Sequence, residues 1–226
     1  MTAMLPTRLC QNNETMNVST SKENILKKIR KALSQSTPLP FPGSEGNTSV
    51  FQPSEQELEV EFAEQFTRLQ GRFVFCINQQ ELAFQLNSLV KKQDWQKVYC
   101  LEDKLIAPFA AQIADRVVKT DLAGCDVSIT GCEALVARTG SIVMSAAQPS
   151  GRNSSVYAPI HICIAFTNQL VYDVKDALQQ VKDKYGNNLP SLITFATGPS
   201  RTADIEKTLV VGVHGPKEVY LFLVEA

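Results

Sequence analysis

The segment TGPSRTADIEKTLVVGVHGP, residues 197–216, places ionisable side chains among turn formers at the junction of two apolar runs. After the Gly198-Pro199 bend, backbone N–H groups and the Arg201 guanidinium could bind a carboxylate or phosphate, because both donate hydrogen bonds to anions. We therefore predict an anion site made by Gly198, Ser200, Arg201 and Thr202. The alternative is a short helix capped by Ser200, Thr202 and Asp204, in which Arg201 only pairs with Glu206.

His214 lies in the same segment, between Gly212 and the Gly215-Pro216 pair. A tight turn does not require histidine, so its imidazole is a candidate general base or ligand contact. We assign His214 and Asp204 as catalytic candidates and Gly215 as a ligand-binding residue; a purely structural histidine is the alternative. The chain has no HxH or HxxxH spacing around its two histidines, and we predict no metal site.

A third candidate is Glu133, in the segment GCEALVARTGSIVMS. We expect a brief helix to begin near Glu133, where the helix dipole would favour the carboxylate by about 0.3–1 kcal/mol. In the other reading, Glu133 is a catalytic nucleophile or base, placed as in folds that handle acyl groups or sugars. The turn that would then contact the ligand is Thr139, Gly140 and Ser141.

The polar segment AAQPSGRNSSVYAPIH, residues 146–161, predicts a long loop with Arg152 near its tip. It is either a mobile flap over a site or a solvated connection between two strands. His161 opens the apolar run that follows, and we predict a hydrogen-bonded core residue there.

These candidates require a scaffold of alternating helices and strands. Apolar residues recur at helical spacing after residue 55, and short continuous apolar runs such as FVFCI, HICIAF and VYLFLV separate them. Continuous runs are typical of strands covered on both faces, so we predict an α/β fold with a largely parallel sheet flanked by helices. Short connections in the second half predict some antiparallel pairs. Ligands of such folds gather at the carboxyl ends of strands.

The first fifth of the chain is different in composition. TSKENILKKIRKAL opens with Thr20 and Glu23 at capping-box spacing and predicts a helix with a basic outer face. The segment 38–53 is rich in proline, glycine and serine and predicts a linker. We divide the chain into residues 1–53, with a disordered start, a helical arm and a linker, and residues 54–226, the α/β domain.

Composition limits the function. The chain has 226 residues, 44% hydrophobic and 20% charged, and a formal net charge of −1. That balance argues against nucleic-acid binding, and no apolar run approaches the roughly 20 residues of a membrane span. The six cysteines form no CxxC pair. We expect reduced thiols of a cytoplasmic protein that holds no iron–sulfur cluster or structural zinc itself.

Three segments resemble a known family: GCEALVARTGSIVMS, SSVYAPIHICIAF and GPSRTADIEKTLVVGVHGPKEVYLFLVE. They are similar to the LUD domain of the lactate utilization protein C (LutC/YkgG) family, from about residue 55 to the end. The resemblance implies a NagB/RpiA/CoA-transferase-like α/β fold. It also implies a subunit without a redox cofactor that acts with iron–sulfur and oxidoreductase partners in oxidising L-lactate to pyruvate. A stand-alone isomerase- or CoA-transferase-like enzyme and a small-anion-binding regulatory protein are the alternatives.

Overall fold

The computed structural model describes residues 20–34, 54, 56–202 and 209–226, and the chain divides into two compact units, residues 1–51 and 52–226. In the first unit, the helix α1 (Thr20–Ser34) confirms the helix predicted from the capping box. Its apolar stripe is exposed: Ile25, Leu26, Ile29 and Leu33. The predicted linker and the polar N-terminal start lie outside the described residues.

The second unit is built on a six-stranded sheet in which every strand pair is parallel. The strand order is β1 (Arg72–Cys76), β12 (Glu218–Val224), β7 (Ile160–Phe166), β4 (Val127–Thr130), β2 (Val98–Tyr99) and β3 (Val117–Val118). The central strands β12, β7 and β4 are almost entirely buried, because both of their faces are covered, and they carry few polar residues, such as Ser128, Thr130 and His161. This arrangement confirms the predicted α/β fold with a mostly parallel sheet.

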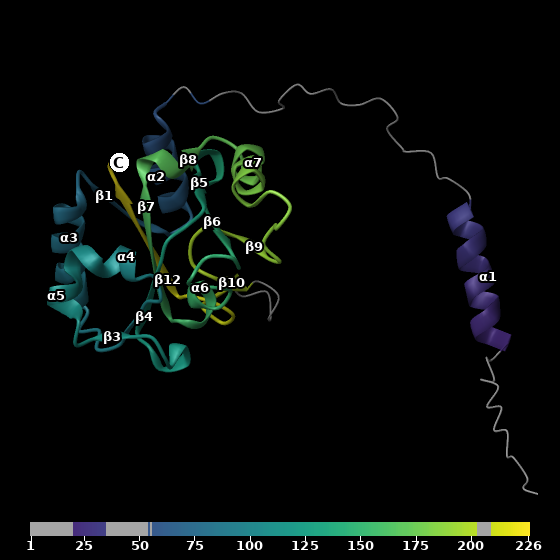
Figure 1. The fold of residues 1–226 in the computed structure, drawn as a ribbon, viewed down its shortest axis with the longest axis horizontal. Helices are drawn as coiled ribbons and strands as arrows, with labels where there is room; N and C mark the ends of the chain where they lie inside the picture. Colours follow the sequence, from purple (N-terminus) through teal and green to yellow (C-terminus); the bar gives the residue numbers. More distant parts are fainter. Residues whose placement is uncertain (1–19, 35–53, 55, 203–208) are drawn as a thin grey trace, which may run out of the picture. The chain divides into compact units, whose positions relative to one another are not determined.

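Helices cover one face of this sheet, on the left of Figure 1. They are α3 (Gln79–Lys92), α4 (Asp103–Ile106), the 3-10 turn η1 (Ala107–Phe109) and α5 (Ala110–Ile113). Leu82, Leu86 and Val90 of α3 pack with alternate residues of the strands, among them Ile129 and Ile162. The helix α3 begins at Asn78, whose side chain accepts a hydrogen bond from the Glu81 backbone at 2.9 Å, as expected for an N-cap.

The opposite face packs against α2 (Leu58–Arg68) and a second, four-stranded sheet. Its order is β8 (Leu170–Val171), β5 (Ala134–Val136), β6 (Ser141–Ser145) and β9 (Ile193–Ala196). The strand β6 runs antiparallel to both of its neighbours, which confirms the predicted antiparallel pairs. The helix α7 (Val174–Tyr185) starts at an Asp173 capping box and covers the far side of this sheet (Figure 1).

Two local predictions differ from the structure. Glu133 does not begin a helix: its backbone N–H donates to the Val143 carbonyl at 2.7 Å and leads into the strand β5. The second is the short helix capped by Ser200: in the structure Ser200 is followed by the short strand β10 (Arg201–Thr202), which pairs with β11 (Val210–Val211). In both places a short chain segment gains backbone partners from a distant strand, a contact that local sequence patterns do not report.

The polar segment 146–161 contains the single helical turn α6 (Ser154–Tyr157) between β6 and β7, and Ser154 and Ala158 are buried there. Arg152 is exposed near the tip and donates to the Ser191 hydroxyl at 2.5 Å. Five cysteines lie in the described residues, and all five are buried free thiols. No helix of the described part of the chain is long and apolar enough to cross a bilayer.

Candidate functional site

Two glycine–proline bends meet beside the amino end of β12. The Ser200 N–H donates to the Pro216 carbonyl, and the Gly212 N–H donates to the Ser200 carbonyl, each at 2.9 Å. Glycine is required for this approach, because a Cβ at Gly215 would lie 2.8 Å from the Cβ of Ser200. Gly198 has φ +103°, and a Cβ there would lie 2.6 Å from the Leu69 carbonyl oxygen. The two bends therefore form one joined loop structure.

This loop structure borders a partly open cavity of about 310 Å³, within the range of small-molecule sites, and we call it the inner cavity because the buried His161 lines it. The predicted residues Gly198, Ser200, His214 and Gly215 all line it. An outer cavity of about 460 Å³ shares Val156, His214 and Gly215 with the inner one. The outer cavity adds two polar side chains, Tyr157 and Lys217. The structure thus brings four of the sequence-predicted residues around one hollow.

The inner wall is mostly neutral and apolar. Among its described lining residues none is Asp, Glu, Lys or Arg, and the apolar ones include Met144, Phe195 and Val219. His161 lies at the wall and is fully buried. Its Nε2 is 2.8 Å from the Thr130 hydroxyl, which confirms the prediction of a hydrogen-bonded core histidine. Burial lowers the pKa of His161 to about 4, so the ring is neutral near pH 7.

The cavity follows the carboxyl end of β9, as the sequence predicted for a ligand site. In the six-stranded sheet, however, it faces the amino ends of β7 and β12, since His161 and Val219 are the second residues of those strands. The polar residues that the two bends bring to its lining are Thr197, Ser200 and His214.

Two other residues of the C-terminal signature, Arg201 and Thr202, lie outside both cavities. Arg201 is exposed and is not among the residues that line either cavity; its guanidinium donates to the Leu69 carbonyl at the end of α2. It therefore ties β10 to α2. Thr202 pairs with Val210 in β10 and β11. Asp204 and the helix predicted around it lie outside the described residues.

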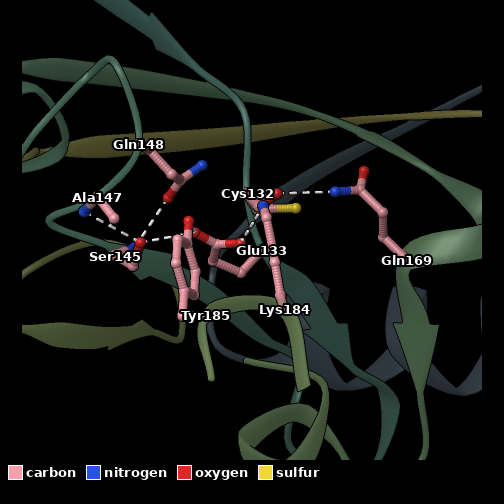
Figure 2. Close-up of polar contacts among 8 residues, drawn as sticks. All are labelled: Cys132, Glu133, Ser145, Ala147, Gln148, Gln169, Lys184 and Tyr185. Carbon is pink, nitrogen blue, oxygen red and sulfur yellow. Dashed lines mark hydrogen bonds and ion pairs between the residues drawn. The ribbon is translucent and has the colours of Figure 1, made fainter. Parts of the chain in front are cut away.

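Glu133 occupies a separate cluster, shown in Figure 2. Its side chain is 2% exposed and accepts three hydrogen bonds. Ser145 and Tyr185 donate to Oε1 at 2.6 and 2.7 Å, and Lys184 donates to Oε2 at 2.7 Å. Burial by itself would raise the pKa of Glu133, but the hydrogen bonds from Lys184, Ser145 and Tyr185 outweigh burial and hold it below its ordinary value.

The contacts around Glu133 connect three elements. Ser145 ends β6, and Lys184 and Tyr185 end α7, so the carboxylate joins both ends to the start of β5. Figure 2 also shows Gln148 bonded to the Ser145 backbone and Gln169 bonded to the Cys132 carbonyl. A carboxylate with three donors is a weak base and nucleophile, because protonation or attack would give up those bonds. The geometry favours a stabilising role for Glu133.

The turn Thr139–Ser141 also lies apart from the cavity. Gly140 has φ +60°, and a Cβ there would lie 2.6 Å from the backbone nitrogen of Phe66 in α2. The hydroxyls of Thr139 and Ser141 bond to each other at 2.7 Å. This turn allows α2 to pack closely on the second sheet, and none of its three residues is among those that line the two cavities.

Sequence reasoning missed several residues of the cavity. Met144 and Ser155 come from β6 and α6, and only tertiary packing brings them to this wall. Lys217 had a signal, because it directly follows the His214-Gly215-Pro216 motif. Among the described residues, no group of three or more His, Cys, Asp or Glu side chains is arranged to hold a metal ion.

Comparison with known proteins gives the family. The LUD domain family model matches residues 8–224. The chain belongs to the LUD domain family. A solved relative of this LUD domain protein is a DUF162 family protein from Deinococcus radiodurans, with a TM-score of 0.59 at 19% identity over 76% of this chain and 99% of that one. That likeness concerns the fold alone, and it agrees with the mixed α/β architecture.

Two curated relatives of this LUD domain protein carry the same functional name, and a third carries none. A lactate utilization protein C of Exiguobacterium is 29% identical over 222 residues, which cover 91% of this chain and 96% of the relative. Another, from Bacillus licheniformis, is 35% identical over 102 residues, or 44% of this chain and 42% of the relative. An uncharacterized protein of Neisseria meningitidis is 29% identical over 125 residues, or 55% of this chain and 53% of the relative. The last two matches span about half the length of each relative.

Proposed function

We propose that this LUD domain protein takes part in lactate utilization as a small-carboxylate-binding subunit. The observation that carries the proposal is the similarity to an Exiguobacterium lactate utilization protein C along 91% of the chain. The subunit acts with iron–sulfur and oxidoreductase partners that oxidise L-lactate to pyruvate. It carries no redox cofactor, since its sequence has neither a CxxC pair nor a GxGxxG motif, and the clusters belong to the partners.

The carboxylate occupies the double cavity at the two glycine–proline bends. Its charged end lies toward the outer cavity, where Lys217 offers positive charge and the exposed His214 offers a ring N–H donor. The inner cavity suits the neutral part of the acid, because burying an unpaired charge against Met144 and Val219 would be costly. Ser200 and the backbone at Gly198 and Gly215 supply further polar contacts at the rim.

Two experiments test the proposal. Deletion of the chain should abolish growth on L-lactate but not on glucose, and affinity purification of the tagged full chain should recover an iron–sulfur protein. Normal growth on lactate together with recovery of no iron–sulfur protein would exclude the function. His214→Ala and Lys217→Ala should weaken L-lactate binding, whereas Arg152→Ala, an exposed residue outside both cavities, should not.

The geometry gives less support to a stand-alone enzyme of the isomerase or CoA-transferase type. That alternative depends on Glu133 as nucleophile or base, and Glu133 is buried under three hydrogen-bond donors away from both cavities. Incubation of the protein with an acyl-CoA, followed by mass spectrometry, would detect a covalent adduct at Glu133. We expect none.

A further inference from the structure

One residue that lines the inner cavity has a buried side-chain nitrogen without a hydrogen-bond partner. His161 is fully buried and lines this cavity, and its Nδ1 has no hydrogen bond within the described part of the chain. Buried polar side-chain atoms are nearly always hydrogen-bonded, so an orphan at the wall of a hollow points to a ligand atom that completes it. The other ring nitrogen, Nε2, is already held by the Thr130 hydroxyl at 2.8 Å.

The contact with Thr130 leaves both states of the ring available. When Thr130 donates its proton to the Met144 sulfur, 3.9 Å away, Nε2 carries a proton and Nδ1 is an acceptor. When Thr130 donates to Nε2 instead, Nδ1 carries the proton and is a donor. Because the threonine hydroxyl can serve either way, the neutral ring can accept a bond from a hydroxyl group or donate one to a carbonyl oxygen.

We propose that His161 Nδ1 binds the 2-oxygen of the acid in this cavity, so that the site selects 2-hydroxy and 2-oxo acids over carboxylates without that oxygen. This inference rests on the proposed function, which places a small carboxylate in the same cavity. The inner volume of about 310 Å³ holds a three-carbon acid together with several waters, at about 30 Å³ per water. The carboxylate stays toward His214 and Lys217, and the 2-oxygen points inward to His161.

Calorimetric titration of the full chain with L-lactate, pyruvate and propionate tests the selection. Propionate has the carboxylate and the carbon chain of lactate but lacks the 2-oxygen. Loss of one neutral hydrogen bond to a buried atom corresponds to about a fivefold to tenfold change in affinity. L-lactate and pyruvate should therefore bind at least about fivefold more tightly than propionate.

Two substitutions of His161 separate recognition from structure. In His161→Asn, one of the two amide atoms bonded to Cγ takes the position of Nδ1. The preference for lactate over propionate should therefore persist in this variant. In His161→Gln the amide reaches the position of Nε2 and keeps the Thr130 contact, and the preference should fall to less than twofold. A merely structural histidine would change the thermal stability of both variants without changing the ratio of the two affinities.

The outcomes are distinct. If propionate and lactate bind equally well to the unaltered chain, the role of His161 is refuted while the proposed carboxylate site stands. If none of the three acids binds, both proposals fail. Should His161→Gln not fold, the comparison of the three acids on the unaltered chain still decides. A matched variant, Thr130→Val, leaves Nδ1 in place and should keep the preference.

Discussion

The cluster at Glu133 allows a quantitative test of the structure through the substitution Glu133→Gln. The amide oxygen of glutamine can keep the bonds from Ser145 and Tyr185, but these change from bonds to a charged group into bonds to a neutral one. Hydrogen bonds to charged groups contribute about 1.5–3 kcal/mol and neutral ones about 0.5–1.5 kcal/mol, so each of the two loses about 1 kcal/mol. The ion pair to Lys184, whose side chain is 59% exposed, adds less than about 1 kcal/mol.

We therefore expect Glu133→Gln to lower the free energy of unfolding by about 2–3 kcal/mol. Urea unfolding followed by the fluorescence of Trp95, the single and buried tryptophan, measures this change. Lys182→Gln is the matched control: it removes a charge from an exposed position of the same helix and should cost less than about 0.5 kcal/mol. A Glu133→Gln protein as stable as the control would refute a buried carboxylate held by three donors.

Acidity gives a second measurement of the same cluster. The pKa of Glu133 in the folded chain lies below its ordinary value of 4.5, so its contribution to stability is present above that pH and is lost as the pH falls through the folded value. The difference in stability between the wild type and Glu133→Gln should therefore shrink as the pH is lowered below about 4.5. A difference that stays constant down to the acid limit would contradict the assignment.

Three further predictions concern packing and reactivity. In thermal unfolding, Gly140→Ala should lower the stability of the chain by more than about 2 kcal/mol, because the new Cβ would collide with the backbone of α2. The control is Gly151→Ala, which has a similar positive φ but nothing within 4 Å of the new Cβ, and it should lower the stability by only about 1 kcal/mol. Arg201→Met should lower the stability by about 1–2 kcal/mol, because the hydrogen bond to the end of α2 is lost. Its affinity for L-lactate, measured by calorimetry, should stay within twofold of the wild type, and a tenfold loss of affinity would contradict this assignment. Burial raises the pKa of Cys76 and of Cys100 to about 11. Both thiols should therefore react with a disulfide reagent at pH 8 only after the chain unfolds. Rapid labelling of the native chain would contradict their burial.

Periodic patterns predicted the layers of this fold well. Phe62 and Phe66 follow helical spacing, and both are fully buried on α2. Two of the continuous apolar runs became parallel strands with both faces covered, β7 and β12, and a third became the partly exposed edge strand β1. These patterns succeed because a helix or strand of five or more residues must turn the apolar positions of its own repeat toward the core, whichever elements pack against it.

Predictions for short segments were less successful, for a physical reason. The strand β5 has three residues and β10 has two, so their hydrogen-bond partners in distant strands determine their conformation. Glu133 was therefore assigned to a helix start although it precedes a strand. The sequence also could not show the partner of Arg201: its guanidinium donates to a carbonyl at the end of α2, a contact between residues far apart in the chain.

The sequence by itself determined the α/β class, the resemblance to the LUD domain family and the glycine–proline bends around Ser200 and His214. These features are local, because they depend on residue type and spacing along the chain. Tertiary structure alone decided that the two bends share a cavity, that the buried His161, with one ring nitrogen unpaired, lines it, and that Glu133 lies in a separate cluster. Those outcomes depend on contacts between residues far apart in the chain, and the packing of two sheets and α2 brings such residues together or keeps them apart.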